Sequence, residues 1–205
     1  MTYKTTEEIR PILDELKQTA FEFMSIEENI YKHTLIVVGI VNRTHELTDT
    51  TLWSIDNDRP HSSALALRGL IETLAFTFYF VEQIFKNGTN AEKLDRLLFG
   101  SRTDVTEFQS VNILSCIDRA IKMFPQLRQS YDDLSEMAHP NANSLFYVGT
   151  PEGGEGEVKF TIPFYKFKGT DKAKTLNQTG ECCYHINRLL KETAQAIKKA
   201  KDSVA

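Results

Sequence analysis

Residues 64–85 read ALALRGLIETLAFTFYFVEQIF and form the longest apolar stretch of this 205-residue chain. Their length and composition predict one long helix rather than a strand. Three charged side chains, Arg68, Glu72 and Glu82, interrupt the stretch, and a helix surrounded by lipid would not readily accept them. We therefore expect the core helix of a soluble protein. The first residues contain no apolar segment of a signal peptide, which predicts a cytoplasmic protein without membrane contact.

Helical spacing of apolar residues recurs on both sides of this stretch. Between the last two predicted helices, residues 144–148 and 158–162 have the composition of strands around a glycine-rich turn, which predicts a β-hairpin over about residues 144–165. The predicted fold class is mainly α: a helical bundle with a β-hairpin inserted before the C-terminal helix, in a single domain over residues 1–205. The helices are expected at about residues 5–24, 25–47, 58–85, 90–98, 111–124, 125–138 and 177–202.

Charge and motif content exclude several classes of function. The net charge of −4, from 24 basic and 28 acidic residues, gives weak support for RNA binding, because a polyanion is not attracted at long range. The three cysteines show no CxxC spacing, so we expect buried thiols and no zinc site. Phosphate-loop and nucleophile-elbow motifs are absent from the sequence. We predict neither a cofactor nor a metal.

Four polar side chains share one line of the central helix. Relative to His61, the residues Arg68, Glu72 and Tyr79 are offset by 7, 11 and 18 positions, so all four fall within roughly 20° of one line at about 100° per residue. Arg68 and Glu72 are four residues apart and within reach of each other. Because an unpaired buried charge is costly, this pair is expected to face a cleft or to find buried partners.

A second polar line lies on the helix predicted at residues 125–138. Arg128, Asp132, Ser135 and His139 share one of its faces, since they are offset by 4, 7 and 11 positions. If the two helices lie side by side, their polar lines form one cluster inside the bundle. The candidate site residues are then Arg68, Glu72, Ser135 and His139, with Tyr131 and His61 beside them.

Two segments resemble a group of uncharacterised bacterial helical proteins. Residues 67–74, LRGLIETL, match its Arg-x-x-x-Glu motif, and residues 131–140, YDDLSEMAHP, match its Leu-Ser-x-x-x-His-Pro motif. This group is similar to the HEPN superfamily of α-helical domains, and the resemblance spans about residues 60–165. It implies a small helical bundle, often a homodimer, of the kind found in toxin–antitoxin and phage-defence systems.

Many HEPN members are metal-independent endoribonucleases in which His acts as acid/base on the ribose 2′-hydroxyl and Arg stabilises the phosphate. Their Arg and His are close together on one helix, whereas here Arg128 precedes His139 by eleven residues. Three hypotheses follow. The first is a non-catalytic interaction module with a protein partner in a bacterial defence or stress system. The second is an endoribonuclease with His139 as acid/base, Arg68 as phosphate clamp and Glu72 orienting Arg68. The third is a structural subunit whose polar cluster only specifies packing.

Overall fold

The structure is a computed structural model that describes residues 2–26, 32–87, 91–100, 109–139, 167 and 170–202. Regular secondary structure in these residues is helical throughout, apart from a single bridge residue at Gln109. The predicted mainly α fold is therefore confirmed. The β-hairpin predicted over residues 144–165 lies outside the described residues.

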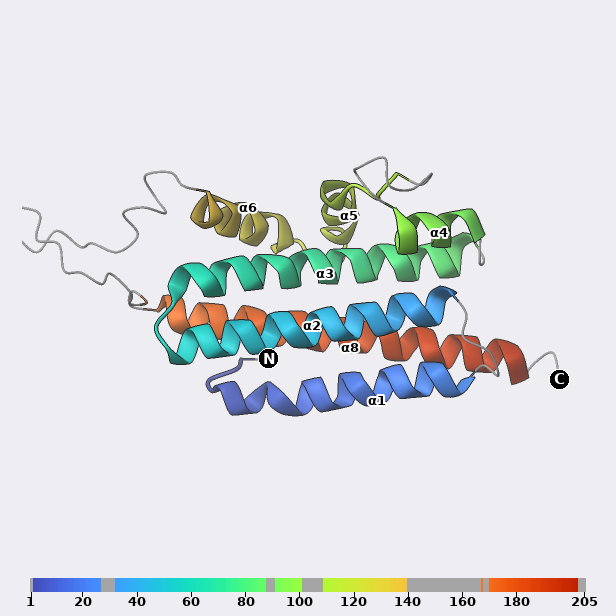
Figure 1. The fold of residues 1–205 in the computed structure, drawn as a ribbon, viewed down its shortest axis with the longest axis horizontal. Helices are drawn as coiled ribbons and strands as arrows, with labels where there is room; N and C mark the ends of the chain where they lie inside the picture. The colour runs from blue at the N-terminus through green and yellow to red at the C-terminus, as the bar shows by residue number, and fades with distance from the viewer. Residues whose placement is uncertain are drawn as a thin grey trace, which may run out of the picture.

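Four long helices pack side by side as a bundle (Figure 1). A short 3₁₀ turn at Thr6–Glu8 leads into the first of them. The four helices are α1 (Arg10–Ile26), α2 (Lys32–Asp56), α3 (Pro60–Asn87) and α8 (Asp171–Asp202).

Three shorter helices form an outer layer along α3, on the side away from α1 (Figure 1). They are α4 (Ala91–Phe99), α5 (Ile113–Ala120) and α6 (Leu127–Ala138). Because α5 and α6 pack on α3, while α2 and α8 cover its other sides, most of α3 is covered by protein.

The position of α3 explains its apolar sequence. Pro60–Gln83 is long and apolar enough to cross a membrane by length and composition, but 67% of its most apolar window is buried inside the bundle. A helix that is covered on several sides is expected to be apolar nearly all round. The predicted core helix is thus confirmed. Its fully buried side chains include Leu67, Leu70, Ile71, Leu74 and Phe80.

Threonines make the bundle interior polar without adding charge. On α2, the Thr44 hydroxyl donates to the Ile40 carbonyl at 2.7 Å, and the Thr48 hydroxyl donates to the Thr44 carbonyl at 2.6 Å. Thr48 also contacts Cys183 of α8, with 3.1 Å between Oγ1 and Sγ. The Thr44 and Thr48 hydroxyls are both satisfied within their own helix, so that these small side chains cost little desolvation energy.

Several helix boundaries differ from the prediction, among them the end of α2 and the start of α8. α2 continues to Asp56, about nine residues beyond the expected end, because Leu52 and Ile55 still face the core. It closes with a Schellman motif, in which the Arg59 amide donates to the Ser54 carbonyl at 2.7 Å and Asp58 adopts a positive φ of 53°. The last helix begins six residues before the predicted position, at Asp171.

Candidate functional site

The centre of the candidate site is Arg68, in the middle of α3. Its Nε lies 3.4 Å from Oε1 of Glu72, one turn further along the same helix, so the ion pair predicted from their spacing is present. Its Nη2 donates a hydrogen bond of 3.0 Å to the Tyr131 hydroxyl on α6, and its guanidinium carbon lies 5.1 Å from the centroid of the Tyr131 ring. Arg68 therefore joins α6 to α3 by a hydrogen bond and a cation–π contact.

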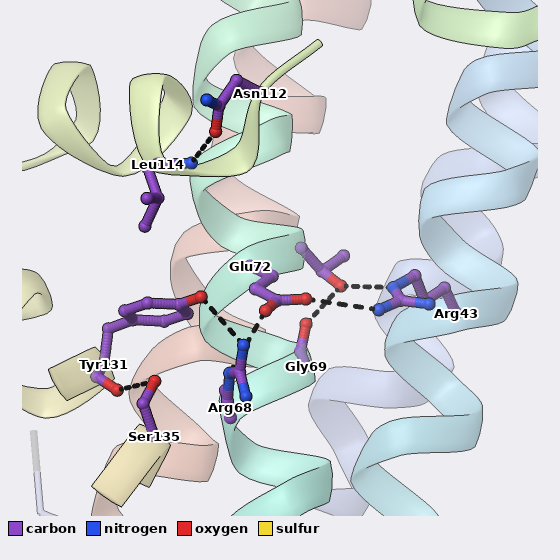
Figure 2. A network of polar contacts seen from close by, with 9 residues as sticks. Arg43, Arg68, Gly69, Glu72, Asn112, Leu114, Tyr131 and Ser135 are labelled. Carbon is purple, nitrogen blue, oxygen red and sulfur yellow. Dashed lines mark hydrogen bonds and ion pairs between the residues drawn. The ribbon is translucent and has the colours of Figure 1, made fainter. Parts of the chain in front are cut away.

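A second arginine reaches the same carboxylate from α2. Arg43 Nη2 lies 3.8 Å from Glu72 Oε2, and Arg43 Nε donates a 3.1 Å hydrogen bond to the Thr73 hydroxyl. Thr73 in turn donates to the Gly69 carbonyl at 2.7 Å, which leaves its oxygen lone pair directed at Arg43. Figure 2 shows the two guanidinium groups on two sides of Glu72. We call Arg43, Arg68, Glu72, Thr73 and Tyr131 the arginine cluster.

The arginine cluster is open to solvent on one side. The Arg43 side chain is 55% exposed, while the side chains of Arg68 and Glu72 are 29% and 23% exposed. One carboxylate thus serves two guanidinium groups, which leaves the cluster with a surplus of one positive charge. Partial exposure keeps these ion pairs weak individually, because water screens them.

Ser135 and His139 lie on α6 but do not join the arginine cluster. The Ser135 hydroxyl donates to the Tyr131 carbonyl at 2.7 Å, within its own helix. His139 is exposed at the end of α6, and its amide donates to the Ser135 carbonyl at 3.1 Å. Eight residues separate His139 from Tyr131, which is about 12 Å along a helix axis.

The direction of α6 increases this separation. Leu127 near the start of α6 shares a hollow with Leu74 of α3, whereas Met137 near its end shares another hollow with Pro60, so the two helices run in opposite directions. His139 therefore lies toward the beginning of α3, while Glu72 lies twelve residues into it. No hydrogen bond or ion pair among the described residues connects the His139 side chain with Arg68 or Glu72.

His61, the other flanking residue of the predicted site, occupies the first turn of α3. It precedes Arg68 by seven residues, or about 10 Å along the helix. The structure thus brings Arg68, Glu72 and Tyr131 together from the predicted set, and it places Ser135, His139 and His61 apart from the Glu72 carboxylate.

Two hollows lie between α6 and α8, where both helices pack on α3. Their volumes are about 150 Å³ and about 70 Å³, and the hydrogen bond of 2.9 Å from Gln178 to Ser130 lies between them. His185 lines the smaller hollow and packs on Phe124, with 4.7 Å between ring centroids. Burial, together with repulsion from Arg188, lowers the pKa of His185.

The cysteines lie outside the arginine cluster, and Cys182 lines the smaller hollow. Cys116, Cys182 and Cys183 are buried free thiols, as predicted. Burial raises the pKa of Cys116 to about 11 and that of Cys183 to about 12. These thiols stay protonated near neutral pH and are poor nucleophiles.

Comparison of the chain with family models, curated proteins and solved structures gives no match. The functional proposal therefore depends on the geometry of the candidate site residues.

Arg43 and Thr73 are the cluster members that the sequence did not indicate. Arg43 lies on an exposed face of α2, where an arginine is ordinary. Thr73 follows Glu72 directly and is buried, so it falls off the polar line of α3. Counting residues from the turn at 57–59 could have indicated this contact. Because α2 and α3 form a helical hairpin, residues at equal distances along the chain from the turn lie opposite each other, and Arg43 and Thr73 are such a pair.

Proposed function

We propose that this chain is a non-catalytic helical interaction module that acts by binding a protein partner. The observation that supports this most is the separation of His139 from Arg68 and Glu72 described above. A general acid/base must lie within hydrogen-bond reach of the proton that it moves, with the stabilising cation beside the same phosphate. One chain does not offer this arrangement with His139 and Arg68.

The polar contacts of the cluster suit a positioning role. Arg68 ties Tyr131 of α6 to α3, and Gln178 ties the adjacent residue Ser130 to α8. α6 is thereby held to two helices while its outer face remains in solvent. A helix displayed in a defined position is a common element of protein–protein interfaces. From the resemblance to HEPN-like proteins, we further propose that the protein is a cytoplasmic homodimer that acts in a bacterial defence or stress system.

The endoribonuclease hypothesis is tested with the purified full chain and a labelled single-stranded RNA, without added metal. We expect intact RNA. Cleavage by the wild type that is lost in both His139→Ala and Arg68→Gln would contradict our proposal and assign the acid/base role to His139. Cleavage that survives both substitutions would point to a contaminating nuclease.

The homodimer is tested by light scattering on the purified chain over a range of concentrations. We expect the mass of two chains. A single-chain mass at all concentrations, together with intact RNA, would favour the third hypothesis, in which the cluster only specifies packing.

A further inference from the structure

We propose that Arg43 and Arg68 form a binding site for a phosphate group on the surface of the molecule, with Glu72 as the positioning residue between them. The site needs no catalysis and no protein partner, so it goes beyond the proposed interaction function. It would bind inorganic phosphate or the phosphate of a small metabolite.

Two guanidinium groups share one carboxylate, so the cluster carries more positive than negative charge. Glu72 Oε1 and Oε2 face Arg68 and Arg43 at 3.4 Å and 3.8 Å, distances of ion pairs without a direct hydrogen bond. The Arg68 Nε is buried and has no hydrogen-bond partner among the residues that the structure describes. The carboxylate thus orients both arginines without using up their donors.

Neutral hydroxyl groups fix the two arginines in place. Thr73 accepts from Arg43 Nε at 3.1 Å, and Tyr131 accepts from Arg68 Nη2 at 3.0 Å. A hydroxyl holds the guanidinium group without cancelling its charge. The arginines are therefore preorganised for an anion, and less side-chain entropy is lost when one binds.

Each guanidinium group has a free edge. Among the described residues, no acceptor bonds to Nη1 of Arg43 or of Arg68, and both side chains are partly exposed. Because both groups lie within 3.8 Å of the same carboxylate, an anion beside Glu72 can reach the two arginines together.

The arrangement fits a phosphate better than a carboxylate. A planar carboxylate has only two oxygens in one plane, and Glu72, which turns one oxygen to each arginine at 3.4 Å and 3.8 Å, makes no direct hydrogen bond to either. Arg43 and Arg68 come from different helices and approach from two sides (Figure 2), so the anion needs oxygens that point in different directions. The tetrahedral phosphate group provides them.

The experiment is a titration of the full chain with sodium phosphate at pH 7 and constant ionic strength, followed by the arginine Nε–Hε signals in ¹H–¹⁵N spectra. We expect the Arg43 and Arg68 signals to shift with one common saturation curve. Arg43→Gln should weaken phosphate affinity about tenfold. Arg43 is exposed and its loss leaves the core intact, so this variant is expected to fold; Arg68→Gln is the second variant.

Arg119→Gln is the matched control. Arg119 lies on the outer helix α5 and, like Arg43 and Arg68, pairs with a carboxylate, but its carboxylate, Glu82, accepts a direct hydrogen bond of 3.0 Å from it. Phosphate affinity should change less than twofold in this variant. An equal loss in Arg119→Gln would show diffuse surface charge and overturn the proposal, as would the absence of saturable shifts. Equal affinity for acetate would overturn the assignment to phosphate. None of these results bears on RNA cleavage or on the dimer.

Discussion

Two arginine–tyrosine contacts join the outer helices α5 and α6 to α3. In one contact the arginine belongs to α3, and in the other it belongs to the outer helix. At α6, Arg68 of α3 reaches Tyr131 of the outer helix, with 5.1 Å between guanidinium carbon and ring centroid. At α5, Arg119 of the outer helix reaches Tyr79 of α3 at 5.2 Å. The cation–π geometry is thus nearly the same in the two places.

The carboxylates beside the two contacts differ. Glu82 accepts a hydrogen bond of 3.0 Å from Arg119, whereas Glu72 lies 3.4 Å from Arg68 and is shared with Arg43. The contact at α5 therefore has the geometry of a surface salt bridge, and the contact at α6 retains donors and positive charge. Similar residue types can thus hold two helices together at α5 and bind a ligand at α6, depending on whether each arginine has a carboxylate of its own.

The largest expected difference between the two contacts is in the tyrosine rings. Tyr131 is buried at 6% exposure, and Tyr79 is only partly buried. Tyr131→Ala should lower the free energy of unfolding by about 3 kcal/mol, because it leaves a cavity and removes the partner of Arg68. Tyr79→Ala should lower it by about 1 kcal/mol. Urea denaturation measures both, and equal losses would contradict the distinction between the contacts.

The hydroxyl groups give the next difference. Tyr131→Phe should cost about 1.5 kcal/mol, since its hydroxyl accepts a bond from a charged donor. The Tyr79 hydroxyl bonds to no described residue, so Tyr79→Phe should stay within about 0.5 kcal/mol of the wild type. A neutral Tyr131→Phe would mean that the hydrogen bond from Arg68 adds nothing measurable and that the Tyr131 ring carries the contact.

At Gly69 of α3, the Leu47 side chain of α2 packs closely beneath the arginine cluster. A Cβ at this position would lie 3.0 Å from Leu47 Cδ1 and 3.7 Å from Arg43 Nη2. Gly69→Ala should therefore destabilise the chain by about 1 kcal/mol, despite the better helix propensity of Ala. Gly39 on α2 is the matched control because its Cβ would meet nothing within 4 Å, and Gly39→Ala should stabilise by about 0.5 kcal/mol. Thermal denaturation compares the two variants, and stabilisation by both would refute a tight helix contact.

The smallest effect concerns His185, which packs on Phe124 at the junction of α5 and α6. Burial lowers the pKa of this histidine in the folded chain, so the unfolded chain takes up the proton at higher pH. Its contribution to stability is present above the ordinary histidine pKa of about 6.5 and is lost as the pH falls below it. His185→Gln should flatten the pH dependence of unfolding in this window. An unchanged slope would exclude His185 as its source.

Sequence periodicity predicted the parts of the site that lie within a single helix. Arg68 and Glu72 are one turn apart, and regular helix geometry alone brings them together. Ser135 lies on α6 and His139 is its C-cap, but their distance from Glu72 depends on how α6 is shifted along α3. Periodicity specifies the angle of a residue around its helix and says nothing about that shift.

The sequence by itself determined that α3 is a helix buried among other helices, that its charged pair is adjacent, and that the thiols are buried, because local spacing and the cost of exposing apolar surface decide these features. Only the tertiary structure decided that Arg43 shares Glu72 and that Tyr131, rather than His139, meets Arg68. The reason is that contacts between helices follow from the packing of all side chains in their interfaces, and this packing sets the direction and register of each helix against its neighbours.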